Sequence, residues 1–290
     1  MSRLKDLIKP YRITNGKDFR LKDHDSEDTG GMQDKAATET LLKQGVAKLA
    51  ELQDKLYADN HWSLLLIFQA MDAAGKDGTI KHVMSGVNPQ GCQVFSFKAP
   101  STEEVDHDFL WRTANRLPER GRIGIFNRSY YEEVLVVRVH PEMLARQRLP
   151  RHRIAKDLWT ERYESINDHE KHLTRNGTVV RKFFLNVGFK EQKRRFLKRV
   201  DDPERNWKFN SADAQERGHW EAYMQAYEEM IRATATKDAP WYVIPADHKW
   251  FTRLVVASAI IDTLEALDLK YPAVNDAQKA ELEKARKLLG

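Results

Sequence analysis

The chain has 290 residues, 41% of them hydrophobic and 31% charged, and a formal net charge of +5 at pH 7. This length suits one α/β domain, and no apolar run approaches the roughly 18 residues of a membrane span, so we expect no membrane partner. The N-terminus also lacks a hydrophobic signal region, so we expect a soluble, cytoplasmic protein. The single cysteine, Cys92, excludes an intramolecular disulfide.

Helical and strand patterns alternate along the chain. Residues 1–35 are polar, and we expect them to form an extended arm over the core of one domain, 1–290. The predicted strands are 63–69, 92–98, 122–126, 178–186 and 241–245. The predicted helices are about 35–58, 76–86, 101–115, 150–174, 211–236, 248–268 and one from 276. Such alternation indicates an α/β fold with a parallel sheet that is covered on both faces.

An apolar strand at 64–69 runs into a loop of small residues that ends at Gly75 and Lys76, before a helix. This order is typical of a phosphate-binding P-loop, in which backbone N–H groups and the positive end of the helix face phosphate oxygens. The lysine, which we expect to be exposed, adds a mobile positive charge. An ordinary strand-to-helix turn is the alternative interpretation.

Two positions depart from the usual P-loop pattern. Ala70 stands where the first glycine of the pattern belongs, and Asp77 replaces the hydroxyl residue that normally ligates magnesium. The simplest consequence is that the metal ligand has moved to Asp72, inside the loop.

The strand at 122–126 is followed by a run of polar side chains that begins with Asn127 and Arg128. Ligands of open α/β sheets bind at the carboxyl ends of the strands. P-loop kinases usually have an acid where Asn127 stands, and asparagine can coordinate a metal but brings no charge. The planar fork of Arg128 matches two phosphate oxygens at once. The alternative is a satisfied surface arginine at a strand end.

Positive charge is concentrated in residues 181–208, which hold ten basic and four acidic residues. Such a field attracts a polyanion, although a solvated helix face is the alternative. Lys190, Arg194 and Lys198 recur every four residues, which places them on one helix face. We expect another face to pack on the core through Phe189, Phe196, Leu197 and Val200.

Four segments together, 71–79, 126–132, 190–199 and 247–250, resemble the polyphosphate kinase 2 family, and the resemblance covers nearly the whole chain. The sequence from Asn127 to Glu132 looks most like the class III subgroup, in which AMP as well as ADP accepts phosphate. Many members have aspartate in place of Asn127 and tryptophan in place of Tyr130, which leaves the magnesium ligands open.

The resemblance implies a three-layer α/β/α P-loop kinase fold with a parallel sheet and a helical lid, at about residues 187–220. It also implies a homo-oligomer, either dimer or tetramer. The implied reaction is a reversible transfer between inorganic polyphosphate and AMP, ADP or ATP, which depends on Mg²⁺ or, as the alternative ion, Mn²⁺.

Phosphoryl transfer depends on in-line positioning and charge neutralisation, and this assigns the roles of the residues. We expect catalytic roles for Asp72, which holds the metal, and for Lys76 and Arg128. Glu132 should influence the choice of acceptor, unless it is only a surface acid. Phosphate contacts are expected from Ala73, Ala74, Gly75, Lys76, Asp77, Gly78, Thr79, Lys81, His82, Arg128, Lys190, Arg194, Arg195 and Lys198. Nucleotide contacts are expected from Asn127, Arg128, Tyr131, Glu132 and Arg138.

Two other classes of protein share parts of this pattern. An ATP-dependent nucleotide kinase would use the same loop, but it needs no elongated cationic track and usually carries the hydroxyl residue that Asp77 replaces. A nucleic-acid-binding protein would explain the basic segment. No aromatic-interleaved sheet signature accompanies that segment, so we expect no nucleic-acid partner.

Overall fold

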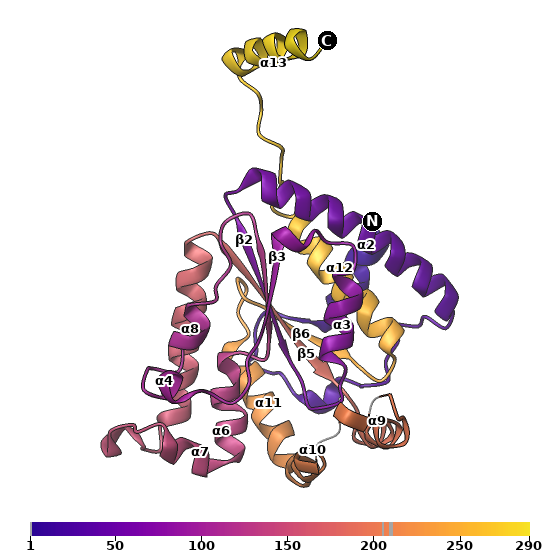
Figure 1. Ribbon diagram of the computed structural model, residues 1–290. Helices are drawn as coiled ribbons and strands as arrows, with labels where there is room; N and C mark the ends of the chain where they lie inside the picture. The colour runs from indigo at the N-terminus through magenta and orange to yellow at the C-terminus, as the bar shows by residue number, and fades with distance from the viewer. Residues whose placement is uncertain (1, 205, 209–210) are drawn as a thin grey trace.

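The computed structural model describes residues 2–204, 206–208 and 211–290. Its centre is a six-stranded sheet in the order β1-β6-β5-β2-β4-β3, in which only β1 is antiparallel to its neighbour (Figure 1). The strands are β1 (Arg12–Ile13), β2 (Ser63–Gln69), β3 (Cys92–Ser96), β4 (Ile123–Asn127), β5 (Thr178–Asn186) and β6 (Trp241–Pro245). The prediction of a parallel α/β sheet is confirmed.

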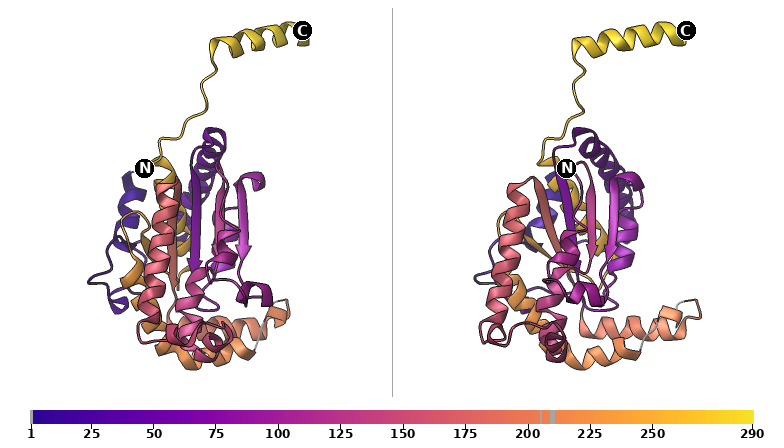
Figure 2. Two further views of the ribbon diagram at one scale, coloured as in Figure 1. Left: turned by 90° about the vertical axis from the view of Figure 1, so that its left-hand side faces the viewer. Right: turned by 60° about the vertical axis from the view of Figure 1, so that its left-hand side comes forward.

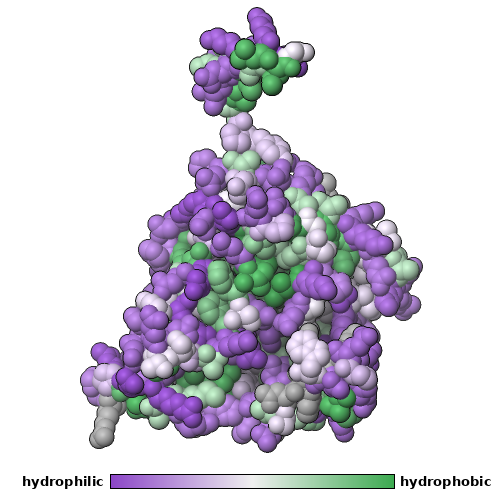
Figure 3. Space-filling view, viewed as in Figure 1, coloured by the Kyte–Doolittle hydropathy of each residue, from purple (hydrophilic) through white to green (hydrophobic). Residues whose placement is uncertain are grey.

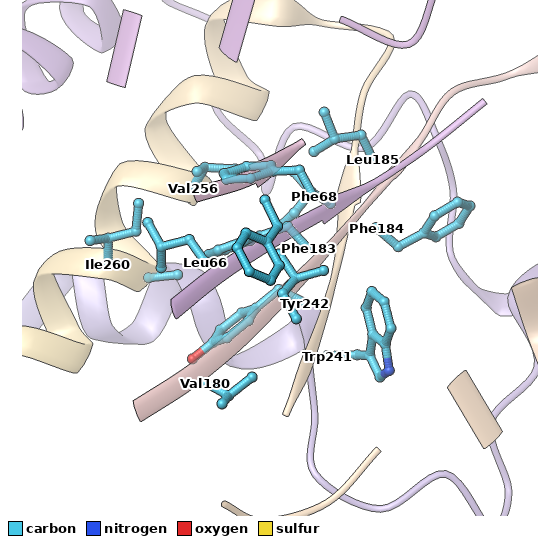
Figure 4. Packing of buried hydrophobic residues seen from close by; sticks show 14 of the residues in the cluster. Leu66, Phe68, Val180, Phe183, Phe184, Leu185, Trp241, Tyr242, Val256 and Ile260 are labelled. Atoms are coloured by element: carbon cyan, nitrogen blue, oxygen red, sulfur yellow. The ribbon is translucent and has the colours of Figure 1, made fainter. Parts of the chain in front are cut away.

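The central strands β2, β5 and β6 are rich in apolar residues because both faces of the sheet are covered. Every residue of β2 and of β6 is buried. Phe68 stacks on Phe183, with 4.9 Å between ring centroids, and Phe183 stacks on Tyr242 at 5.3 Å (Figure 4). This aromatic row crosses three adjacent strands and packs toward Val256 and Ile260 of the covering helix. In the parallel register of these strands, Phe68 pairs with Phe183 and Phe183 with Tyr242.

Helices cover both faces of the sheet (Figures 1 and 2). On one face lie α2 (Lys35–Asp59), α3 (Lys76–Val83) and α12 (Lys249–Glu265), and on the other lie α6 (Val136–Val139), α8 (Leu158–Arg175) and α11 (Trp220–Thr234). The short helices are α1 (Ser2–Ile8), α4 (Thr102–Val105), α5 (Trp111–Ala114), α7 (Pro141–Arg146) and α10 (Ser211–Glu216). The 3-10 turns are η1 (Lys9–Tyr11), η2 (Leu21–Asp23), η3 (Pro89–Gly91), η4 (Tyr130–Val134), η5 (Arg151–Arg153), η6 (Asn206–Lys208) and η7 (Arg217–His219). The three-layer arrangement agrees with the expected fold class.

The N-terminal arm, which was expected to be extended, is in part helical. It contains α1 and the strand β1, which pairs with β6 through Arg12 and Ile13. Tyr11 is buried and lies edge-on to Phe251 of α12, with ring centroids 5.9 Å apart. The arm therefore completes one edge of the sheet.

Two of the predicted helices are broken into shorter ones. Residues 101–115 form α4 and α5, and the capping box at Ser101 is present. The region 211–236 is divided into α10, η7 and α11. The last helix, α13 (Asp276–Leu289), stands away from the body with all of its residues exposed (Figure 2). Within the described ranges, no helix is long and apolar enough to cross a bilayer.

The opposite edge of the sheet, β3, faces the viewer in Figure 1. Apolar side chains gather near the middle of this face in Figure 3, and Val94 of β3 is 52% exposed. The carboxyl ends of the parallel strands lie at the lower edge in Figure 1, close to α9 (Phe189–Asp201) and α10. The predicted site residues gather at that edge.

Candidate active site

The candidate P-loop, residues 70–75, connects β2 to α3. Its backbone includes two residues in the left-handed region, Ala73 with φ of 61° and Gly75 with φ of 105°. A non-glycine residue in this region is held there by its surroundings, because its own preference is for other backbone conformations. Helix α3 begins at Lys76, so the positive end of the helix lies directly after the loop.

Lys76 is buried, with only 7% of its surface exposed, so the expectation of an exposed lysine is wrong. Its Nζ donates to the carbonyl oxygen of Ala70 at 2.6 Å and lies 3.5 Å from that of Met71. Burial lowers the pKa of the Lys76 ammonium, and the nearby Arg128 lowers it further. A buried ammonium with carbonyl partners alone is an unfavourable arrangement that a bound anion would relieve.

Arg128 connects the end of β4 to the candidate P-loop. Its φ is 65°, and its backbone N–H donates to the carbonyl of Phe68 at 3.0 Å. The guanidinium donates to Asp72 at 2.7 Å and to Glu132 at 3.4 Å. These two carboxylates, Glu132 foremost, raise the pKa of Arg128. The residues predicted to be catalytic therefore lie close to one another. The side chain of Arg128 is 37% exposed and that of Asp72 is 29% exposed.

The polar residues around Arg128 are joined to one another. Gln69, the last residue of β2, donates through Nε2 to Glu132 at 2.8 Å. Asn127 donates through Nδ2 to Asp77 at 2.8 Å. Asn127 and Glu132 thus lie beside the candidate P-loop, where the sequence predicted them.

The residues that the structure describes around Arg128 could hold a divalent ion such as Mg²⁺ through few protein ligands, but they do not form a complete metal-binding cluster. Among the described residues, no three or more His, Cys, Asp or Glu side chains are arranged to hold a metal. Mg²⁺ is commonly held by one or two carboxylates together with substrate phosphates and water. The partly exposed Asp72 carboxylate, beside Asp77 and Asn127, suits that mode.

Helix α9 is fastened to the outside of the candidate P-loop by two buried side chains, Gln192 and Arg195, which we call the clasp. Gln192 donates to the carbonyl of Asp72 at 3.0 Å. Arg195 donates to the carbonyls of Ala73 and Ala74 at 3.2 and 2.7 Å. Its other contacts are the carbonyls of Ala246 and Asp247 and the carboxylate of Glu191. Because the clasp binds loop carbonyls from outside, it favours loop N–H groups that face the opposite way.

Other cations form an exposed surface beside the clasp. Arg194 is 66% exposed at its side chain and pairs with Glu191, and Lys190 and Lys198 are exposed too. A hollow of about 360 Å³ lies between Lys190 and Arg194 of α9 and the residues Asp247 and His248 before α12. Lys81 and His82 are exposed on α3.

Three predicted site residues have other contacts in this structure. The side chain of Tyr131 is fully buried and donates to Glu170, so the expectation that it contacts nucleotide is wrong. Arg138 pairs with Glu229 at 2.5 Å and donates to Tyr163 at 3.1 Å. Arg195, which was expected to contact phosphate, donates to backbone carbonyls of the protein in this structure.

The packing of α9 also differs from the prediction. Of the four apolar residues expected to face the core, only Phe196 is buried; Phe189, Leu197 and Val200 are 45–52% exposed. Two of the ten basic residues counted in this region lie on β5: Lys182 is wholly buried, and Arg181 is half-buried and donates to Thr263 of α12. The basic surface is therefore smaller than the sequence suggested.

Four residues at the site escaped prediction. Gln69 and Gln192 are uncharged, and no pattern distinguishes them from surface glutamines. Lys249 starts α12, and its pKa is lowered by burial and then by Arg195 and Arg253. Asp213 of α10 has its pKa raised by burial and by the nearby Asp72. Of these four residues, only Lys249 had a signal in the sequence, its position directly after Asp247 and His248.

Comparison with known proteins identifies the family of this chain. The family model for polyphosphate kinase 2 matches residues 32–272. An ADP-polyphosphate phosphotransferase from Rhodopseudomonas palustris is 50% identical over 287 residues, which cover 99% of each chain. An AMP/ADP-polyphosphate phosphotransferase from Meiothermus ruber is 41% identical and covers 94% of this chain and 98% of its own.

A solved structure adds the fold. The crystal structure of polyphosphate kinase 2 from Arthrobacter aurescens superposes with a TM-score of 0.87 at 40% identity, and the match covers 96% of both chains. The sequence motifs, the arrangement of the strand ends and these matches agree along nearly the whole chain, which belongs to the polyphosphate kinase 2 family.

Proposed function

We propose that this protein transfers a phosphoryl group between inorganic polyphosphate and AMP or ADP, reversibly. The observation that carries the proposal is the meeting of a buried lysine, Lys76, and a bridging arginine, Arg128, beside an exposed row of cations on α9. Relatives at 50% and 41% identity are named as polyphosphate phosphotransferases for ADP and for AMP/ADP.

In this proposal Lys76 and the backbone of residues 73–79 hold the phosphoryl group in flight. The transferred group supplies the anionic partner that the buried ammonium of Lys76 lacks, so the charge of Lys76 stabilises the protein–substrate complex most when that group is bound. Arg128 bridges donor and acceptor with its planar fork. It exchanges its contact with Asp72 for phosphate oxygens while it stays beside the candidate P-loop.

Asp72 holds the divalent ion in this proposal, with magnesium as the first candidate and manganese as the alternative. The ion would neutralise charge on the phosphates. Asn127 and Asp77, which are hydrogen-bonded to each other, offer further oxygen atoms beside it. Asp72 thereby serves the site in two ways, as a metal ligand and as the resting partner of Arg128.

Acceptor choice is assigned to Glu132, whose carboxylate lies between Gln69 and Arg128. A negative charge there disfavours an acceptor that carries more phosphate charge, so it favours AMP and ADP over more highly phosphorylated nucleotides. The polyphosphate chain is assigned to the exposed cations Lys190, Arg194 and Lys198, with Lys249 and Arg253 of α12 as an extension. Segment 187–220 acts as the lid. A dimer or tetramer stays a prediction.

One assay tests the proposal against the alternative of an ATP-dependent nucleotide kinase. Purified protein is incubated with ADP, polyphosphate and Mg²⁺ in the absence of ATP, and ATP formation is followed; AMP replaces ADP in a parallel reaction. We expect ATP from ADP and ADP from AMP. The Lys76→Met variant, prepared in the same way, shows whether a contaminating kinase contributes.

Absence of product from polyphosphate, with phosphorylation of AMP by ATP, would overturn the proposal in favour of the alternative. Binding of nucleic acid without either activity would favour the third class of protein, a nucleic-acid-binding protein.

A further inference from the structure

A charged pair lies in the core behind the candidate active site. Lys182 of β5 is 0% exposed at its side chain and Glu170 of α8 is 2% exposed, and their charged atoms are 2.6 Å apart. Removing two charges from water is unfavourable, and an apolar pair of similar volume often serves stability as well or better. The pair therefore calls for an explanation other than packing.

Both members of the pair bind the turn that follows Arg128. Oε1 of Glu170 accepts hydrogen bonds from the hydroxyls of Tyr130 and Tyr131, at 2.9 and 2.7 Å. Nζ of Lys182 donates to the Tyr131 hydroxyl at 3.0 Å and to the carbonyl of Thr234 at 2.7 Å. Burial raises the pKa of both tyrosines well above the usual value, so their hydroxyls stay protonated and can donate. We call Tyr130, Tyr131, Glu170 and Lys182 the core network.

The chain around the turn alternates between the core network and the site. Tyr130 and Tyr131 point into the core, whereas Arg128 and Glu132 on either side contact the candidate P-loop region through Asp72 and Gln69. Arg128 has a left-handed backbone, which its neighbours must hold in place. The turn also contains a hydrogen bond of 3.1 Å from the N–H of Tyr131 to Oγ of Ser129.

We propose that Glu170 and Lys182 are positioning residues for phosphoryl transfer, because they anchor two adjacent tyrosines and thereby fix Arg128 and Glu132 opposite the candidate P-loop. The inference rests on the proposed function, in which Arg128 contacts the reacting phosphates. A small displacement of such a group lowers the rate of transfer without removing the substrate contacts made elsewhere.

The first test removes only the two hydroxyls, with the double substitution Tyr130→Phe and Tyr131→Phe. We expect kcat for ATP formation from ADP and polyphosphate to fall about tenfold or more, with little change in KM for polyphosphate. The control is Tyr11→Phe, which removes a similar buried hydroxyl bonded to a carboxylate, Asp28 at 2.6 Å, in the N-terminal arm. The control should keep the wild-type kcat.

A double-mutant cycle then asks whether the effect passes through Arg128. In an Arg128→Lys background, the two tyrosine substitutions should cause little further loss, because the group that they position is already compromised. A second variant, Glu170→Leu with Lys182→Met, removes both charges together and should give the same result. Equal losses in both backgrounds would overturn the inference.

A readout independent of activity separates this inference from the proposed function. Hydrogen exchange of peptides that contain residues 128–135 should be faster in the tyrosine variant than in the wild type, and unchanged in Tyr11→Phe. Unchanged exchange in the tyrosine variant would overturn the positioning role. If the wild type fails to use polyphosphate while exchange changes as expected, the proposed function is wrong and the anchoring of the turn stands.

Discussion

Two buried lysines in this protein have opposite surroundings. Lys182 has an acceptor for each of its three N–H bonds, in Glu170, Tyr131 and Thr234. Lys76 has one short contact, to the carbonyl of Ala70, and no ion pair with a described carboxylate. Burial lowers the pKa of both.

The difference indicates what each charge is for. A fully satisfied buried lysine contributes to a network of the folded protein, and its loss leaves a carboxylate buried without a partner. An incompletely satisfied lysine at the start of a helix is arranged for a ligand that is not part of the chain. Substitutions at the two positions should therefore separate activity from stability.

The largest effect on activity is expected from Lys76→Met. Transfer from polyphosphate to ADP should fall by about 100- to 1,000-fold, because the charge faces the transferred group. The free energy of unfolding should stay within about 1 kcal/mol of the wild type, or rise, since a poorly paired buried charge is removed. Steady-state ATP formation and urea unfolding measure the two quantities.

The matched control for this substitution is Lys171→Met, which removes an exposed lysine of α8. It should change neither activity nor stability measurably. Full activity in a folded Lys76→Met variant would refute the assignment of the P-loop.

The opposite outcome is expected for Lys182→Met, which should lower the free energy of unfolding by about 3–5 kcal/mol because Glu170 loses its buried counter-ion. Adding Glu170→Leu should restore most of that loss. Urea unfolding of the two variants measures it. If the single substitution costs less than 1 kcal/mol, Lys182 is not the counterpart of Lys76 that its contacts suggest.

The two lysines also show where sequence reasoning succeeds. Four of the five parallel strands were predicted from apolar runs that identify buried strands, whereas β3 has fewer apolar residues and is partly exposed. Asp72, Lys76 and Arg128 were brought together because strand ends share one edge. Lys182 was counted among surface cations, because charge along a sequence carries no information on burial.

Other features were beyond prediction for similar physical reasons. The strand β1 has only two residues, too few for any periodicity. Arg194 and Arg195 are adjacent and alike in sequence, but only Arg195 faces the loop, and the rotation of α9 that decides this depends on tertiary contacts. The apolar stripe of α9 was wrong because Leu197 and Val200 lie on the face turned outward.

Asp72 lies in the candidate P-loop, four residues before Lys76, and we expect it to hold the metal ion. Asp72→Asn should lower activity by about 10- to 100-fold and raise the Mg²⁺ concentration needed for half-maximal activity, because Asp77 supplies no hydroxyl and Asn127 no charge. Magnesium titrations of the variant and the wild type measure this. Overlapping titration curves would mean that the metal ligand lies elsewhere.

Two adjacent arginines of α9, Arg194 and Arg195, extend the comparison, because they are neighbours in sequence but differ in burial. Arg195→Ala should lower the free energy of unfolding by about 2–3 kcal/mol and activity by about tenfold, because four loop and strand-end carbonyls lose a buried donor. Arg194→Ala, the control, should cost less than about 1 kcal/mol, since the Arg194 side chain is 66% exposed and Glu191 keeps Arg195 as its partner. Urea unfolding and ATP formation are measured for both. Equal losses of stability would contradict the clasp.

The smallest effect is expected from neutralising the exposed cations Arg194 and Lys198 together. Apparent affinity for polyphosphate should weaken about three- to tenfold in 10–20 mM salt, and that for ADP much less, because only the longer anion reaches along α9. The difference from the wild type should shrink as salt rises and screening shortens the range of attraction, to about 10 Å at 0.1 M. The measurement is the KM for each substrate over an ionic-strength series.

The control for this variant is the neutralisation of Lys171 and Arg175, an exposed pair with the same spacing on α8. It changes the net charge of the protein by the same amount, so it separates a local contact from the general field. Equal weakening by the two variants would mean that net charge alone attracts the chain. Equal weakening for polyphosphate and ADP in the α9 variant would mean that this surface does not distinguish a long phosphate chain from a nucleotide, and the assignment of α9 to polyphosphate would be wrong.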